Sequence, residues 1–301
     1  MFDGPLSASA YELLGVAPSA TDDDLRRAYR LRLRQTHPDT GGDATMFVRV
    51  QRAWEMVGTP QARSAYDRGR TGHSWAASSA TPGATGTRPR GRSFGQAGAW
   101  RRSRYRELLA AELGHPVTDA AAYDPLVVRA ASWEARRMLA DALAEEATAA
   151  AVDELGIGFT AWHDVALGDD EADKLDHVVL APSGLYGLLS EDFGAPVRFR
   201  QGEVIGVGDA APIAALLSRM RRVARSARVR FGGGILILPD DALDDAVTPL
   251  GGIRGVPVVV VRRSALRLVL RTGVPGARVL GGNEAFDVRS RLIHSVRVLV
   301  P

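Results

Sequence analysis

The chain has 301 residues, 46% of them hydrophobic, so it can bury a sizeable core and is long enough for two domains. It contains no cysteine, which excludes disulfides, thiolate catalysis and zinc sites built from cysteine. The formal net charge is only +3 and Lys174 is the only lysine, so charge alone does not imply nucleic-acid binding.

The amino-terminal residues show no sign of a targeting segment. Asp3 and Pro5 stand where a secretory signal would need an apolar stretch. The longest apolar runs, such as residues 256–261, are far too short to cross a bilayer. We therefore expect no membrane association, and a cytoplasmic location is the default.

Up to residue 70 the sequence predicts short helices with clear starts. Ser7 or Ser9 can cap a short helix that contains Tyr11. Thr21 or Asp22 begins the next helix, and its acidic first turn complements the helix dipole.

The second and third predicted helices carry complementary apolar stripes. In the second helix the stripe consists of Leu25, Ala28, Tyr29 and Leu33. The rest of that helix surface carries Arg26, Arg27, Arg30 and Arg34. In the third helix the stripe consists of Phe47, Val50, Gln51, Trp54 and Val57. Two antiparallel helices can therefore pack together and leave a positively charged face exposed.

Residues 36–42 form the bend between these two helices. Pro38 has no N–H to donate, and it keeps the preceding His37 out of the helical region. Gly41 and Gly42 follow as a glycine turn. We expect His37, Pro38 and Asp39 to be exposed at this bend.

These elements resemble the J-domain of the DnaJ (Hsp40) co-chaperone family. The similar segments, in the order and spacing of that family, are Tyr11–Val16, Leu25–Arg30, His37–Asp39, Phe47–Val57 and Ala62–Asp67. Thr36 departs from the pattern, because an aromatic residue is common there, and we expect weaker packing beneath the loop. We assign residues 1–70 to this J-domain.

The resemblance implies a protein partner and the residues that bind it. The partner is an Hsp70 of the DnaK type in its ATP state, whose ATPase the domain stimulates. The residues implicated are His37, Pro38, Asp39, Arg26, Tyr29 and Arg30. Arginine side chains suit charge-assisted contacts with an acidic groove. The resemblance implies no catalytic residue, metal or cofactor, so we expect that the protein is not itself an enzyme.

Residues 71–98 change abruptly to Gly, Ser, Ala, Thr and Pro with scattered arginines. Such a segment lacks the apolar surface to offset its ordering entropy, which predicts a flexible linker. Residues 99–129 follow as a helical connector, with a helix over residues 100–113. Arginines stand among Trp100 and Tyr105 in that helix, a pattern that suits either a phosphate backbone or a solvated amphipathic helix.

Residues 130–301 have the pattern of a mixed α/β domain. Strands are predicted over residues 159–167, 176–181, 184–190, 197–200, 203–207, 235–238 and 256–261. Helices are predicted over residues 130–155, 211–231, 264–270 and 283–293, the last capped by Asn283. The predicted fold class is therefore a multidomain protein, with an all-α helical J-domain, a flexible linker and a mixed α/β C-terminal domain.

Part of this domain also resembles the nuclease-related NERD domain, whose fold is of the restriction-endonuclease type. The similar segments are Ala144–Glu146, Asp164–Leu167 and Leu175–Tyr186. That family would hold a divalent metal with a Glu on the first helix, an Asp before the central strand and an acid-x-Lys pair on the next strand. Glu145 or Glu146 and Asp176 match the first two positions.

The third position of the NERD pattern fails in this chain. No lysine follows residues 184–188, and Lys174 precedes Asp176 on a loop or at a strand start, out of register. We therefore expect a NERD-like fold that is kept for structure or binding and does not cleave nucleic acid.

Other polar groups in the domain give weaker signals. The spacing of His163, His177 and His294 suggests no metal triad, so we expect surface or strand-packed histidines. The acidic turn over residues 169–173 lacks the glycine and the terminal Glu of a calcium loop. Six arginines between residues 219 and 230 are expected to form a solvated helix surface.

The sequence thus predicts a J-domain co-chaperone without a zinc module, whose C-terminal domain acts as a targeting or client-binding module. The alternative is a nucleic-acid-binding or nuclease-related protein that recruits Hsp70. Both ligands of the C-terminal domain, a protein client and a nucleic acid, stay open at this point.

Overall fold

The computed structural model describes residues 4–6, 8–72, 91–168, 170–200, 202–205 and 211–299, which form two compact units. The first unit holds the described residues up to 72 together with Thr118–Ala130. The second holds those from 91 to 117 and from Ala131 onward. A multidomain chain with a helical N-terminal part and a mixed α/β C-terminal part is confirmed. Most of the predicted linker, residues 73–90, lies outside the described residues.

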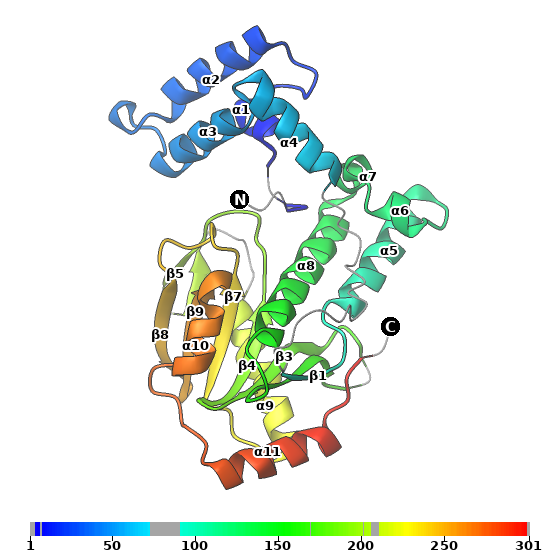
Figure 1. The fold of residues 1–301 in the computed structure, drawn as a ribbon, viewed down its shortest axis with the longest axis vertical. Helices are drawn as coiled ribbons and strands as arrows, with labels where there is room; N and C mark the ends of the chain where they lie inside the picture. Colours follow the sequence, from blue (N-terminus) through cyan, green and yellow to red (C-terminus); the bar gives the residue numbers. More distant parts are fainter. Residues whose placement is uncertain are drawn as a thin grey trace. The chain divides into compact units, whose positions relative to one another are not determined.

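The first unit is built from helices with well-defined starts (Figure 1). Its N-terminal helices are α1 (Ala10–Leu14), α2 (Asp22–Thr36), the short 3-10 helix η1 (Pro38–Thr40), α3 (Ala44–Val57) and α4 (Pro60–Gly72). Ser9 caps α1 and Thr21 caps α2, each in a capping box completed by an acid three residues later. Both caps agree with the sequence prediction.

The core of this unit lies where α1, α2 and α3 meet. It consists of Ala10, Tyr11, Leu14, Leu25, Val50, Ala53 and Val57. The predicted stripe of α3 was wrong at Gln51, which is exposed, whereas Ala53 is buried. The reason is that α3 packs against α1 as well as α2, which turns its buried face toward Ala53.

A segment distant in sequence joins the same unit. It contains α6 (Asp119–Ala122) and α7 (Pro125–Ala130), which the sequence analysis placed in a connector and did not predict as helices. Arg129 at the end of α7 lies 3.3 Å from Glu12 of α1, measured between guanidinium nitrogen and carboxylate oxygen. The helical unit is thus assembled from two separate stretches of chain.

The second unit is organised around one seven-stranded sheet. Its strands are β1 (Arg92–Phe94), β2 (Thr160–Ala166), β3 (Lys174–Ala181), β4 (Gly184–Ser190), β7 (Gly233–Leu238), β8 (Val247–Ile253) and β9 (Val256–Arg262). They lie in the order β1-β2-β3-β4-β7-β9-β8. The pairs β2–β3, β3–β4 and β8–β9 are antiparallel, and the others are parallel. A separate hairpin joins β5 (Arg198–Arg200) to β6 (Glu203–Ile205).

Helices cover both faces of this sheet (Figure 1). One face carries the end of α8 (Trp133–Asp153) and α10 (Leu266–Thr272), which follows the short 3-10 helix η2 (Arg263–Ala265). The other face carries α9 (Pro212–Ala227) and α11 (Gly282–Ser295). A further helix, α5 (Ala99–Leu113), packs along α8. Among the described residues, no helix combines the length and the apolar character needed to span a bilayer.

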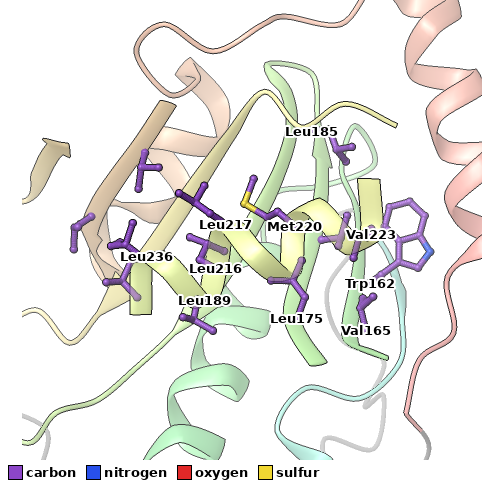
Figure 2. Packing of buried hydrophobic residues seen from close by; sticks show 14 of the residues in the cluster. Trp162, Val165, Leu175, Leu185, Leu189, Leu216, Leu217, Met220, Val223 and Leu236 are labelled. Atoms are coloured by element: carbon purple, nitrogen blue, oxygen red, sulfur yellow. The ribbon is translucent and has the colours of Figure 1, made fainter. Parts of the chain in front are cut away.

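The apolar face of α9 fits closely onto the sheet. Figure 2 shows Leu216, Met220 and Val223 directed from the helix toward strand residues such as Leu189 and Leu236. Gly187 of β4 lies directly beneath this helix, and a Cβ atom there would stand 2.4 Å from Cγ of Met220. The bare backbone of that glycine therefore sets how closely α9 approaches the sheet.

Three features of the second unit differ from the sequence-based expectation. β1 lies within residues 71–98 and pairs with β2, although only three residues form it. β8 was missed because Pro249 and two glycines weaken its strand pattern, which an edge strand tolerates. The expected cap of the last helix was wrong, because α11 has Gly281 at its N-cap and Asn283 lies inside the helix.

We predict that Gly187→Ala lowers the free energy of unfolding by about 1 to 3 kcal/mol, because the added methyl group overlaps Met220. Urea unfolding of the full chain measures this change. The matched control is Gly252→Ala in β8, where a Cβ atom meets no neighbour within 4 Å, and its effect should stay within about 0.5 kcal/mol. Adding Met220→Ala to Gly187→Ala should cost less than the two single changes combined; strict additivity would contradict the steric account.

Candidate functional site

The bend after α2 has the geometry that its proline dictates. His37 has an extended backbone conformation, with φ −64° and ψ 127°, and it ends α2. The same residue begins η1, where its Nδ1 atom accepts a hydrogen bond of 3.2 Å from the N–H of Asp39. His37, Pro38 and Asp39 therefore form one rigid turn instead of a loose connection.

Two backbone hydrogen bonds close this turn. The N–H of Gly42 donates to the carbonyl of His37 at 3.0 Å, and the N–H of Gly41 donates to that of Pro38 at 3.0 Å. A Cβ atom on Gly42 would stand 2.3 Å from the backbone of Thr36, so the closed turn has no room for a side chain there. The His37 ring also meets Phe47 of α3 edge to face, with ring centroids 5.0 Å apart. Phe47 thus supplies aromatic packing although position 36 is a threonine.

The polar surface of the turn faces solvent. The Asp39 side chain is 87% exposed and that of His37 is 41% exposed. Along α2, Arg26 and Arg30 are also exposed, and Arg26 pairs with Asp23 at 3.3 Å. Five of the six implicated residues, His37, Pro38, Asp39, Arg26 and Arg30, are therefore accessible.

Tyr29, the sixth implicated residue, has a different environment. Its ring stacks on Trp54 of α3, with centroids 4.6 Å apart and an angle of 8° between the planes. The ring is half-buried, so one of its faces contributes to the packing of α2 on α3. A role for Tyr29 in partner binding stays a prediction.

A second polar constellation lies buried in the sheet unit and is centred on Lys174. Its Nζ atom lies 2.7 Å from both carboxylate oxygens of Glu145, 2.7 Å from Asp164 and 3.1 Å from Asp176. These four side chains are at most 2% exposed. They come from α8, β2 and β3, so one ammonium group joins a helix to two strands.

Each carboxylate of this Lys174 cluster also accepts a hydrogen bond from a backbone N–H. Glu145 accepts from the N–H of Gly98 at 3.1 Å and Asp176 accepts from that of Ser190 at 2.9 Å. Asp164 accepts from the N–H of Trp100 at 3.4 Å. Such complete pairing is what buried charges require, because each unpaired ion costs several kcal/mol.

Two cations extend the cluster along α5 and α8. Arg101 lies 2.5 Å from Glu145 and 3.0 Å from Asp141, and Arg137 lies 3.0 Å from Asp141. Burial would lower the pKa of Lys174, but Asp176, Glu145 and Asp164 together raise it above its ordinary value. Lys174 is therefore a permanent cation in the folded protein.

Lys174 lies at a strand start ahead of Asp176, as expected, but its side chain still reaches the acidic residues. It is the first residue of β3, and its ammonium lies between the carboxylates of Asp164 and Asp176. Glu145, and not Glu146, belongs to this cluster, since Glu146 pairs with Arg102 instead. Among the described residues, no group of three His, Asp or Glu side chains is arranged to hold a metal ion.

Local backbone conformation explains why sequence periodicity missed Asp164. This residue has φ 49°, a left-handed conformation that interrupts the alternation of β2. Trp162 and Val165 consequently contribute to the same apolar cluster although they are three residues apart. The left-handed conformation lets the carboxylate of Asp164 contact Lys174.

His163 and His177 are strand-packed, as expected, and they pair with each other across β2 and β3. Their Nδ1 atoms lie 2.8 Å apart. The Nε2 atom of His177 lies 3.2 Å from the hydroxyl of Ser190, which donates to Thr148. His177 then donates through Nε2 and accepts through Nδ1 from His163, so the His177 ring is neutral in this arrangement. Burial favours the neutral form of both rings, because it lowers the pKa of His163 to about 4 and that of His177 well below its usual value.

The remaining candidate groups show no convergence on a site. His294 is exposed and bonds to the carbonyl of Ser290 on its own helix. In the acidic turn, Asp173 pairs with Arg222 of α9, while Asp169 lies outside the described residues.

We predict that Lys174→Met lowers the free energy of unfolding by about 3 to 5 kcal/mol, because three carboxylates lose their shared cation while the side-chain volume is kept. Chemical denaturation of the full chain measures the loss. The matched control is Arg267→Met, which removes an exposed pair with Glu154 and should cost less than about 1 kcal/mol. Equal losses in the two variants would show that the cluster does not stabilise the unit.

Comparison with known proteins concerns the N-terminal segment. The family model of the DnaJ domain matches residues 9–67. The segment is 43% identical over 58 residues to a DnaJ protein homolog of Cucumis sativus, a match covering 19% of this chain and 14% of that protein. It is 45% identical over 62 residues to the chaperone protein DnaJ of Bordetella petrii, covering 19% of this chain and 17% of that protein.

A third relative, the chaperone protein DnaJ of Thermosynechococcus vestitus, is 46% identical over 61 residues, which is 19% of this chain and 16% of that protein. The chain thus spans only about a sixth of the length of these curated relatives. The matched residues are the ones that form α1 to α4 and the His37–Asp39 turn. Residues 9–67 are therefore a J-domain of the DnaJ type.

Proposed function

We propose that the chain is a J-domain co-chaperone that binds an Hsp70 of the DnaK type and stimulates its ATPase. The His37-Pro38-Asp39 turn and the basic face of α2 make the contact. The observation that carries the proposal is the turn itself. Backbone hydrogen bonds fix its conformation, and the side chains of His37 and Asp39 are accessible to solvent.

Rigidity of the turn matters for this activity. A partner's ATPase is stimulated only if the contact favours one of the partner's conformations, and a flexible loop would lose binding energy on ordering. The closed turn reaches the partner already ordered, because Gly42 and Phe47 hold His37 in place.

The basic face of α2 supports the docking step. Arg26 and Arg30 lie one helical turn apart and are both exposed. Exposed arginines of this kind raise the association rate with an acidic groove and make it sensitive to salt. In the proposal, Tyr29 contributes by holding α2 on α3 through Trp54 and by its position beside these arginines.

In this proposal the second unit acts as a targeting or client-binding module, and the protein works in the cytoplasm. Lys174 already fills the centre of its acidic cluster with all neighbouring carboxylates paired. The proposed activity therefore belongs to the Hsp70 that the J-domain stimulates, and the chain itself hydrolyses nothing.

We predict that the full chain accelerates single-turnover ATP hydrolysis by a DnaK-type Hsp70 and that His37→Gln abolishes the acceleration. The substitution removes the exposed imidazole and its bond to the N–H of Asp39. The matched control is His115→Gln, which changes an exposed histidine of the second unit and should leave the acceleration intact.

Circular dichroism verifies that His37→Gln retains its helices. Undiminished acceleration by this folded variant would refute the role of the turn. No acceleration by the unmodified chain would refute the co-chaperone proposal as a whole.

We further predict that Gly42→Ala reduces the acceleration at least about tenfold, since a methyl group cannot coexist with the closed turn. The control is Gly41→Asn, because Gly41 has φ 81°, a conformation that Asn tolerates, and open space around it. The same ATPase assay compares the two. A larger loss of ATPase acceleration in Gly41→Asn than in Gly42→Ala would show that the activity does not require the close approach of Gly42 to Thr36.

A further inference from the structure

A cavity of about 300 Å³ lies in the second unit, beside the end of α9 and along α11. Its floor is formed by the buried Val229 and Val288. The charged residues around it are Arg228, Arg230, Arg278, Arg291, Glu284 and Asp287. Four guanidinium groups and two carboxylates thus surround one small space, and none of them belongs to the J-domain.

The fold explains how the arginines come together. α9 buries its apolar face against the sheet (Figure 2), and residues 211–239 contain no acidic residue at all. Arg228 ends the helix in a left-handed conformation with φ 52°, and its carbonyl accepts a hydrogen bond of 2.9 Å from Arg291 of α11. This bond fixes the relative positions of the two helices at the edge of the cavity.

The positive charge of the cavity is only partly compensated. Arg278 pairs with Glu284 through two contacts of 2.7 and 3.0 Å. Within the part of the chain that the structure describes, Arg228 and Arg230 form no ion pair. Two arginines that face one small space without a counterion repel each other, and an anion bound between them removes this repulsion.

The carboxylates define which anion fits. Asp287 lines the cavity without an ion pair among the described residues, whereas both carboxylate oxygens of Glu284 contact Arg278. Carboxylate oxygens accept hydrogen bonds from hydroxyl groups and repel a second phosphate. Guanidinium groups in turn match the oxygens of a phosphate through paired N–H donors.

We propose that this cavity binds a small phosphate monoester with a hydroxyl-bearing body, of the sugar phosphate class. The phosphate lies between Arg228, Arg230 and Arg278, and the hydroxyl groups face Asp287. A volume of about 300 Å³ is sufficient for one such molecule. The site is independent of the Hsp70 contact, since every lining residue lies in the second unit.

Isothermal titration of the full chain with ribose 5-phosphate tests the proposal. We expect saturable binding at one site per chain, no binding of ribose, and weaker binding of both inorganic phosphate and fructose 1,6-bisphosphate. Absence of saturable ribose 5-phosphate binding would overturn the proposal. A single-stranded oligonucleotide that bound more tightly, and lost its binding in Arg230→Gln, would replace the small ligand by a nucleic acid and also overturn it.

Variants assign the binding to the cavity. Arg230→Gln and Arg278→Gln should each weaken ribose 5-phosphate binding about tenfold, the usual effect of losing a charge-assisted hydrogen bond. The matched control is Arg221→Gln, an exposed arginine of α9 outside the cavity, which should bind normally. Asp287→Asn should reduce the preference for ribose 5-phosphate over inorganic phosphate. Equal weakening by Arg221→Gln would show a diffuse charge effect and refute the site.

Discussion

The second unit depends on one ammonium group that three buried carboxylates share. Burying four charges is costly unless every one of them is paired and hydrogen-bonded, and the Lys174 cluster meets that condition with donors from several segments. Its members belong to α8, β2 and β3, with backbone donors before α5 and at the end of β4. These segments must therefore order together, because the loss of any one partner leaves a buried charge unpaired, and that charge then costs the full desolvation penalty.

The two units show opposite uses of charge. In the J-domain, Arg26, Arg30 and Asp39 face water, where a charge costs little and can meet a partner. In the sheet unit, Glu145, Asp164 and Asp176 point inward, and Lys174 satisfies them. The same residue types are thus available to a partner in one unit and hold the fold together in the other, and burial is what distinguishes the two situations.

This difference also decides what the sequence could predict. The J-domain elements follow from local signals: Ser9 and Thr21 cap helices, and Pro38 ends one, all within a few residues of their effect. The central strands were predicted equally well because their apolar runs are continuous. Glu145 and Asp176 were singled out only through the NERD resemblance, and their contact with Lys174 was not predicted, because the contacts of this cluster join residues up to 64 positions apart and depend on the left-handed backbone of Asp164. The cavity beside Arg230 was missed for the same reason, since Arg291 reaches it from α11, which packs on α9, and Arg278 reaches it from the segment before α11.

The burial of Lys174 has a chemical consequence, because this residue carries the only lysine amine in the whole chain. Acylating reagents, and enzymes that attach groups to lysine, need an accessible and deprotonated amine. In the folded unit that amine is at most 2% exposed and held as a cation by its neighbours. Lysine-directed modification therefore requires the sheet unit to open first, and its rate is a direct measure of how often the cluster comes apart.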